Sequence, residues 1–421
     1  MKTYLTPFVI AAGLAAGPAA AYCTALTDVA NAPKKYKRLL PVLSDTQTGW
    51  IVAQDQLKTE FVVTDEVRGL WRQIHADFAA KGIKLVVLAP PPRPLLAPAT
   101  VTKGYDRDAA EALHATYIAE LNAAGLTAPD LMEVANSTGP ENYYFSRDTH
   151  WTPMAAALSA QALAIAVTGS TAPLPTTTEV YKERGALNEL VEKICGKSPE
   201  PELVDAPVFE TQNTSLLGDA EKPSAVLLGT SFSNRNKRDA YRVADALSHA
   251  MGRPVENRSV SGGGATASME AFIWSGALDT GQYNLVIWEA PYSVPLTSIA
   301  NLRQVAGSLA QAGNAKELAT VAVNDQWQNL RVKFSTDQFA TLVVETPGVK
   351  TGELSVELIS AKGKKHFYKL RKSDRSPQSD RSALWKIALT HLPFDAVERI
   401  KLRLRDGSVA AKVWLEGKAY N

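Results

Sequence analysis

Residues 224–233 read Ser-Ala-Val-Leu-Leu-Gly-Thr-Ser-Phe-Ser, a short apolar run that stops at a glycine. A continuous apolar run of this length predicts a strand that is buried on both faces, as in a parallel sheet covered by helices. Ligands bind beyond the carboxyl ends of the strands in such open sheets. We therefore expect Ser231, just past the strand, to present its hydroxyl in a cleft.

The flanking sequence alternates between helix-like and strand-like segments. Apolar spacing predicts helices over 64–81 and 106–124, and an Ala-rich helix from Pro153 to about Val167 with Thr152 as its N-cap. Further strands are predicted at 83–88, about 258–261 and 284–288, with helices at about 237–251 and 265–276. This alternation predicts a three-layer α/β domain. Residues 171–213, rich in Pro, Thr and Glu, are interpreted as a long insertion.

The pattern changes after about residue 315. Polar and apolar residues alternate at 342–345, 354–358, 366–370 and 400–404, which predicts a β-sandwich of about 100 residues. From Thr320 onward 18 Lys and Arg face 11 Asp and Glu, a balance of +7, whereas the whole chain carries only +2. We predict domains over 22–312 and 316–421, with a protease-sensitive link near Gln311 to Ala315.

Composition excludes several classes of protein. The chain has 421 residues, 45% apolar and 21% charged, which is ordinary for a globular protein and excludes disorder, collagen and coiled coil. Two cysteines exclude a disulfide scaffold and a Cys-rich zinc site, and the six histidines show no paired-ligand spacing. No nucleotide-binding loop is found either. We expect neither a metal nor a cofactor.

The N-terminus indicates export. Lys2 is followed by an apolar run from Tyr4 to about Leu14 and by Ala19-Ala20-Ala21, the order of a signal peptide over residues 1–21 that is cleaved before Tyr22. The alternative is a membrane anchor, which needs about 20 apolar residues and would have to pass through two glycines and a proline. No membrane span is expected after processing.

Both cysteines remain after such cleavage, in an oxidising compartment. A single bridge between Cys23 and Cys195 would pin the new N-terminus to the body of the protein, and two unpaired buried thiols are the alternative. Tyr22 stands where a lipoprotein signal requires a small residue, so lipidation of Cys23 is not expected.

A second polar motif precedes the Ala-rich helix. Serine is a poor nucleophile at neutral pH and needs a base, which in turn needs a carboxylate to hold its tautomer. His150 is the candidate base for Ser231, and Asp148 is its candidate partner. Taken one at a time, an Asp before a helix is usually a cap, a Gly-Thr-Ser after a strand is usually a turn, and a lone His is usually packed in the interior. Candidate donors to an oxyanion are the amides of Ser231 and of the Gly262-Gly263-Gly264 loop and the hydroxyl of Tyr292, which a tight turn and a core tyrosine would also explain.

Three segments together resemble a known family. Tyr144–Pro153, Gly229–Ser233 and Val286–Pro291 are similar to motifs of the AlgX and AlgJ family of periplasmic alginate O-acetyltransferases, closest to its AlgX branch. The resemblance implies an SGNH-hydrolase-like fold with permuted motif order, and a C-terminal carbohydrate-binding module. It also implies Ser231 as the acetyl-accepting nucleophile, His150 as base and Asp148 as its partner. The segment Ala290-Pro291-Tyr292-Ser293 lacks a charged pair that the AlgX branch has there.

The implied function is O-acetylation of an exported, alginate-like polyuronate in the periplasm through an acetyl-serine intermediate. The implied acetyl donor is a protein of a membrane-associated acetylation machinery. Two alternatives remain open, a polysaccharide acetylesterase with the same residues and a non-catalytic polysaccharide-binding scaffold of an export complex.

A basic cluster in the last domain fits such a polymer. Its cations lie beside Phe367 and Tyr368 and are Lys362, Lys364, Lys365, Lys369, Arg371 and Lys372. Lys and Arg pair with carboxylates, and aromatic rings stack on sugars, so we expect these residues to bind a uronic-acid polymer. A merely solvated sheet face explains the same charges. Nucleic acid is not expected as a partner of an exported protein.

Overall fold

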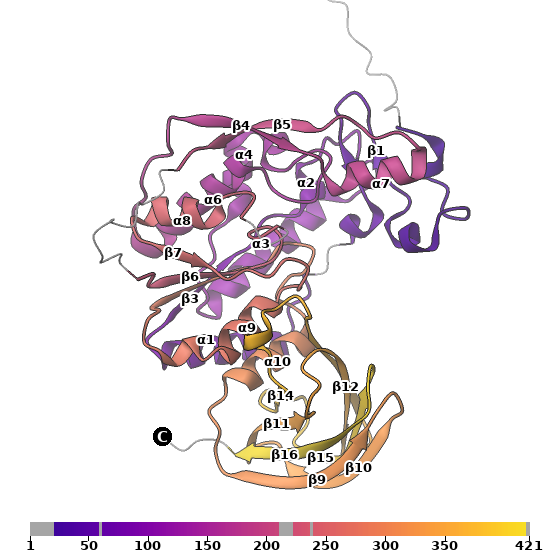
Figure 1. Ribbon diagram of the computed structural model, residues 1–421, viewed down its shortest axis with the longest axis vertical. Coiled ribbons are helices and arrows are strands. Elements are labelled where there is room, and N and C mark those ends of the chain that lie inside the picture. The colour runs from indigo at the N-terminus through magenta and orange to yellow at the C-terminus, as the bar shows by residue number, and fades with distance from the viewer. Residues whose placement is uncertain (1–20, 59–60, 210–221, 236–238, 418–421) are drawn as a thin grey trace, which may run out of the picture.

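A computed structural model describes residues 21–58, 61–209, 222–235 and 239–417 (Figure 1). The predicted signal peptide lies outside these residues except for Ala21. Within the same ranges, no helix is both long enough and apolar enough to cross a bilayer. The predicted α/β domain followed by a β-sandwich is confirmed (Figure 1).

A parallel sheet in the order β3-β8-β6-β7 forms the middle layer of the first domain. Its strands are β3 (Lys84–Leu88), β8 (Leu285–Glu289), β6 (Ala225–Leu228) and β7 (Val255–Asn257). The first three were predicted, but the strand predicted at 258–261 was wrong. β6, the neighbour of β7 in the described sheet, ends at Leu228, so residues beyond Asn257 have little strand left to pair with. They form a loop, in which the Val260 N–H donates to Gly229 O at 3.0 Å.

Helices cover both faces of this sheet (Figure 1). One layer contains α1 (Asp65–Ala79), α9 (Ala267–Trp274) and α10 (Ile299–Leu309), and the other contains α6 (Pro153–Thr168), α8 (Val243–Met251) and α4 (Leu131–Thr138). The remaining helices of this domain are α3 (Arg107–Ala123), α2 (Arg93–Leu96) and α5 (Pro140–Tyr143). Thr152 caps α6 as predicted, because its Oγ1 accepts the Ala155 N–H at 3.2 Å. Helix α10 was not predicted.

The insertion is an antiparallel hairpin of β4 (Thr178–Glu183) and β5 (Glu202–Pro207), with α7 (Ala186–Cys195) between its strands. Helix α7 packs its apolar face on the N-terminal segment, which holds β1 (Leu43–Ser44) and β2 (Ile51–Val52). Cys23 and Cys195 form a disulfide with a Cα–Cα distance of 5.9 Å, which confirms the predicted bridge. One end of α7 is thereby tied to the start of the described chain.

Two antiparallel four-stranded sheets make up the described sandwich, in the orders β10-β15-β12-β13 and β14-β11-β16-β9. The strands are β9 (Ala315–Val323), β10 (Gln328–Ser335), β11 (Phe339–Glu345), β12 (Gly352–Ser360), β13 (Lys365–Lys372), β14 (Leu384–Ala388), β15 (Ala396–Leu404) and β16 (Val409–Gly417). Every second side chain of the central strands enters a core shared by the two sheets.

Helix α10 joins the sandwich to the α/β domain. Arg303 of α10 is fully buried and donates to Glu66 of α1 at 2.7 Å and to the carbonyl of Ala388 at 2.6 Å. A side chain at Gly307 would lie 2.8 Å from the backbone nitrogen of Ile387, so only glycine allows this close approach. Residues 310–314 link α10 to β9, and cleavage there remains a prediction.

Candidate active site

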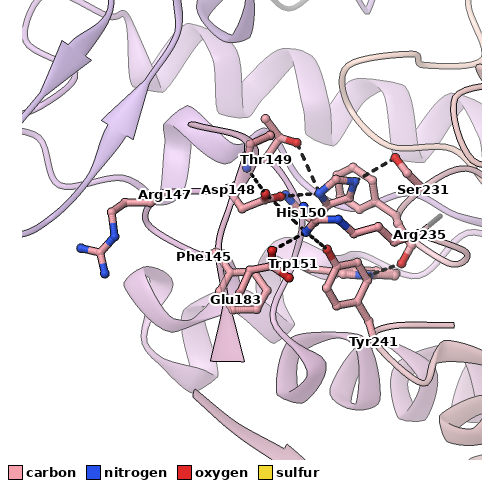
Figure 2. A network of polar contacts seen from close by, with 12 residues as sticks. Phe145, Arg147, Asp148, Thr149, His150, Trp151, Glu183, Ser231, Arg235 and Tyr241 are labelled. Carbon is pink, nitrogen blue, oxygen red and sulfur yellow. Dashed lines mark hydrogen bonds and ion pairs between the residues drawn. The ribbon is translucent and has the colours of Figure 1, made fainter. Parts of the chain in front are cut away.

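Asp148, His150 and Ser231 meet at the carboxyl end of the parallel sheet (Figure 2). Ser231 follows β6, and the other two residues precede α6. The Ser231 Oγ lies 2.8 Å from His150 Nε2. On the other side of the ring, His150 Nδ1 contacts Asp148 Oδ1, which also accepts the His150 N–H at 2.9 Å. The structure therefore brings together the three residues predicted to act on an ester.

Trp151 explains how the local sequence aligns these segments. Its ring is fully buried, and its Nε1–H donates to the carbonyl of Phe232 at 2.9 Å, one residue past Ser231. The ring of Phe232 also lies 4.8 Å from that of His150. Trp151, the last residue of the Asp-x-His-Trp motif, thus fixes this motif to the turn at Gly229–Ser233, which we call the serine turn.

Asp148 is completely buried, and both of its carboxylate oxygens have partners. Oδ2 accepts the N–H of Ala186, the first residue of α7, at 2.6 Å and lies 3.5 Å from Arg235 Nη1. Burial raises the pKa of Asp148, but the contacts with His150, Arg235 and the Ala186 N–H outweigh burial and hold this pKa below its ordinary value. The carboxylate is therefore ionised at neutral pH and can accept a hydrogen bond from the His150 ring.

A second buried carboxylate, that of Glu289 at the end of β8, forms hydrogen bonds with the serine turn. It accepts the Thr230 N–H at 2.7 Å and the Ser233 hydroxyl at 3.2 Å. Burial raises the pKa of Glu289 to about 7. Glu289 was not predicted as a site residue, although an acidic residue at the end of an apolar strand is a signal that the sequence contains.

One backbone N–H group of the serine turn, that of Ser231, is available to a substrate. Thr230 N–H donates to Glu289, Phe232 N–H to Thr230 Oγ1, and Ser233 N–H to Thr230 O. Among the described residues the Ser231 N–H has no such acceptor. It is therefore free to donate to an oxygen that develops negative charge next to Ser231 Oγ.

The glycine loop at 262–264 lies beyond β7, next to the end of β6. The Val260 N–H bonds Gly229 O, and Gly262 and Gly264 have φ values of +75° and +70°. Tyr292 is buried, and its hydroxyl accepts Gln56 Nε2–H at 2.9 Å. A role for these residues as oxyanion donors stays a prediction.

The predicted basic cluster is divided by the alternation of β13. Lys365, Phe367 and Arg371 point outward and are exposed, and Lys369, also outward, lies 3.4 Å from Glu353; Lys364 is exposed just before the strand. Lys372 points inward instead, is 8% exposed, and donates to the carbonyl of Ser382 at 2.7 Å. The prediction that Lys372 binds polymer was therefore wrong, because its ammonium is used in the interior.

Two residues of neighbouring strands and loops extend this outer face and were missed by the sequence analysis. The guanidinium of Arg403 lies 4.8 Å from the centre of the Trp327 ring, and that ring is 6.1 Å from Phe367. The alternation of β15 indicates that Arg403 lies on the outward side of the sheet, so the sequence contained a signal for this residue. Which side chain lies beside Arg403 depends on the order of the strands, and the sequence does not show that order. We found no group of three potential metal ligands in the described part of the chain.

Comparison with known proteins places the chain in a family. A protein-family model described as "SGNH hydrolase-like domain, acetyltransferase AlgX" matches residues 46–292. The chain is 29% identical over 296 residues to the alginate biosynthesis protein AlgX of Pseudomonas syringae pv. tomato, an alignment that covers 65% of this chain and 60% of that protein. It is 26% identical over 267 residues to the probable alginate O-acetylase AlgJ of Pseudomonas aeruginosa, covering 58% of this chain and 68% of AlgJ.

The fold is also that of a solved structure. The structure of Pseudomonas aeruginosa AlgX covers 94% of this chain and 100% of its own, with a TM-score of 0.68 and 22% identity. In sequence, the chain spans about 60% of the length of the AlgX proteins that it matches. Since the family match takes up more than half of its residues, the chain belongs to the family of SGNH hydrolase-like, AlgX-type acetyltransferase domains.

Proposed function

We propose that the protein is an O-acetyltransferase that moves an acetyl group to a hydroxyl of an exported, alginate-like polysaccharide through an acetyl-Ser231 intermediate. The observation that carries the proposal is the hydrogen-bonded series Asp148–His150–Ser231, with 2.8 Å between His150 Nε2 and Ser231 Oγ. Membership in the AlgX family and the similarity to a probable alginate O-acetylase support it.

The first half-reaction loads the serine. Ser231 Oγ attacks the acetyl carbonyl of the donor while its proton moves to His150 Nε2, and the ionised Asp148 stabilises the imidazolium. The Ser231 N–H donates to the tetrahedral oxyanion. The intermediate then expels the donor's leaving group, which takes the proton from His150, and acetyl-Ser231 remains. The resemblance implies that the donor is a protein of a membrane-associated machinery.

The second half-reaction transfers the acetyl group. A sugar hydroxyl attacks acetyl-Ser231, gives its proton to His150, and leaves as the acetyl ester once the serine oxygen has regained that proton. If water attacks in place of the sugar, the same residues make an acetylesterase. The outcome depends on how well polymer is held beside Ser231 and water is excluded.

Two surfaces bear on the choice of acceptor. A cleft of about 1120 Å³ lies between the two domains and is lined by three arginines, Arg258, Arg375 and Arg381, and by two aspartates, Asp374 and Asp380. The residues Asp148, His150 and Ser231 are not among those that line it. The outward side of sheet β10-β15-β12-β13, which we call the basic face, carries Lys365, Lys369, Arg371, Arg399, Lys401 and Arg403 around the Trp327–Phe367 pair. Cations attract carboxylates, and aromatic rings offer stacking surface to sugars.

Export to the periplasm belongs to the same proposal. The Cys23–Cys195 disulfide supports an oxidising compartment, as does the predicted signal peptide.

The decisive experiment follows the acetyl group. The wild-type protein is mixed with a chromogenic acetyl ester and defined oligouronates, and mass spectrometry locates acetyl on the Ser231 peptide and on the sugar. Ser231→Ala should abolish ester turnover and both acetylated species while polymer binding persists. Ser137→Ala, at an exposed serine on α4, is the matched control and should behave as wild type.

Each alternative gives a different result. Ester turnover that survives in Ser231→Ala contradicts the role of Ser231. Hydrolysis without transfer to any oligouronate indicates an acetylesterase. Polymer binding without turnover in the wild-type protein indicates the scaffold.

A further inference from the structure

Arg235 connects the serine turn to the carboxylate behind His150. It lies four residues after Ser231, and its Nη1 is 3.5 Å from Asp148 Oδ2 and 2.7 Å from Glu183 Oε1 (Figure 2). The same nitrogen donates to the hydroxyl of Tyr241 at 3.0 Å. The side chain of Arg235 is only 17% exposed. One guanidinium thus joins the turn that bears Ser231, the loop that bears Asp148, and strand β4.

Arg235 compensates the negative charge of two neighbouring carboxylates. Asp148 and Glu183 are two buried carboxylates that share this cation. Burial raises the pKa of Glu183, Arg235 lowers it, and Asp148 raises it again. Among the described residues, the titratable and charged groups that face Asp148 and Arg235 are His150 from the same loop, Glu183 from β4, Tyr241 before α8, and Arg93 of α2.

The contacts of Asp148 show what Arg235 adds. Oδ1 faces His150, and Oδ2 faces the Ala186 N–H and Arg235, so the plane of the carboxylate is fixed from both sides. Loss of the guanidinium would leave Oδ2 with one backbone donor and a neighbouring like charge on Glu183. The carboxylate could then rotate, which weakens its hold on His150 Nδ1–H.

We propose that Arg235 is a positioning residue that holds the carboxylate of Asp148 aimed at His150 and so sets the rate of acetyl transfer. The proposal rests on the proposed function of Ser231 and His150. Arg suits this position better than Lys, because a guanidinium keeps its charge when buried, whereas a buried ammonium loses its proton more readily.

The test uses the full chain with Arg235→Met, Arg235→Lys and, as matched control, Arg184→Met. Arg184 forms an ion pair with Glu192 in the same insertion, but it is exposed. For Arg235→Met we expect kcat for a chromogenic acetyl ester to fall about 10- to 100-fold, with KM little changed. Arg235→Lys should recover part of kcat, and Arg184→Met should match wild type.

A second measurement does not need turnover. In ¹⁵N-labelled protein, the His150 resonances report which ring nitrogen bears the proton, and Arg235→Met should shift them away from the Nδ1–H tautomer while Arg184→Met leaves them unchanged. Wild-type kcat and wild-type His150 resonances in Arg235→Met would overturn the proposal. So would equal losses in Arg235→Met and Arg235→Lys that follow loss of fold in thermal melts. If wild type lacks esterase activity, the proposed function fails, and the His150 resonances still decide the role of Arg235.

Discussion

The carboxylate of Glu289 accepts the backbone N–H of Thr230 at 2.7 Å, one residue before Ser231. The interaction explains why Gly229 has no side chain: a Cβ there would lie 3.0 Å from the Cβ of Glu289 and closer still to its carboxylate. These hydrogen bonds connect the buried end of β8 to the serine turn. In the described chain, no cation is among the contacts of Glu289.

Glu289 should make stability depend on pH. Its pKa in the folded protein is about 7, above the ordinary 4.5, because burial disfavours the charge. The folded state therefore binds the proton more tightly, so this contribution to stability is complete below about pH 4.5 and is lost as the pH rises through 7. Denaturant unfolding of Glu289→Gln should show a flatter dependence over this range than wild type. An equal pH dependence in both proteins would contradict the assignment.

Replacing Glu289 by Ala should cost more than replacing it by Gln. The alanine leaves the Thr230 N–H buried without an acceptor, at a cost of about 1–3 kcal/mol, and frees the turn that carries Ser231. We expect a large fall in kcat for acetyl-ester turnover in Glu289→Ala and a small one in Glu289→Gln, measured side by side at neutral pH. Equal activity of the two variants would show that the turn holds its shape alone.

Gly185 is the point where α7 approaches Asp148. A side chain there would overlap the carbonyl oxygen of Arg147 and lie 2.7 Å from Asp148 Cβ. Gly185→Ala should therefore push the Ala186 N–H away from Asp148 and lower kcat. The control is Gly196→Ala at the other end of α7, where φ is +74° and no atom lies within 4 Å. It should cost about 1–2 kcal/mol of stability from backbone strain and leave kcat unchanged.

The Cys23–Cys195 disulfide should affect activity as well as stability. It holds the C-terminal end of α7, while the N-terminal end donates to Asp148. The double variant Cys23→Ser/Cys195→Ser should lose about 2–4 kcal/mol of unfolding free energy and some ester turnover. Reductant should lower the melting temperature of wild type and not of the variant. Two free thiols in the denatured, unreduced wild type would refute the bridge.

Binding of long polyuronates should depend on the basic face and on salt. Exposed ion pairs contribute only about 0–1 kcal/mol each and are screened over about 8 Å at physiological ionic strength, so affinity should fall steeply as salt is added. Phe367→Ala and Lys365→Gln should weaken binding and transfer to long chains, and leave turnover of a small acetyl ester intact. Lys412→Gln, on the outward side of the other sheet, is the control. Salt-independent binding, or equal effects at Lys365 and Lys412, would contradict this role.

The sequence by itself determined those features whose signals are local. Apolar runs and helical spacing are properties of adjacent residues, so β6, α1 and α6 could be predicted, and with them the position of Ser231 at a strand end. Asp148 and His150 are only two residues apart, so they lie in the same short segment in any fold. Export and the count of two cysteines led to the correct disulfide.

Only the tertiary structure decided which distant groups surround that serine. Glu289, Arg235 and Gly185 come from a strand end, a loop and an insertion, and no local pattern says that they converge on Asp148 and Thr230. The strand expected at 258–261 failed for the same reason, since its extent depends on where β6 ends. Lys372 looked like its neighbours in sequence, yet the pleat of β13 turned it into the interior. Burial and strand pairing depend on the whole chain. A local sequence pattern therefore predicts helices and strands, but not which of their residues come into contact.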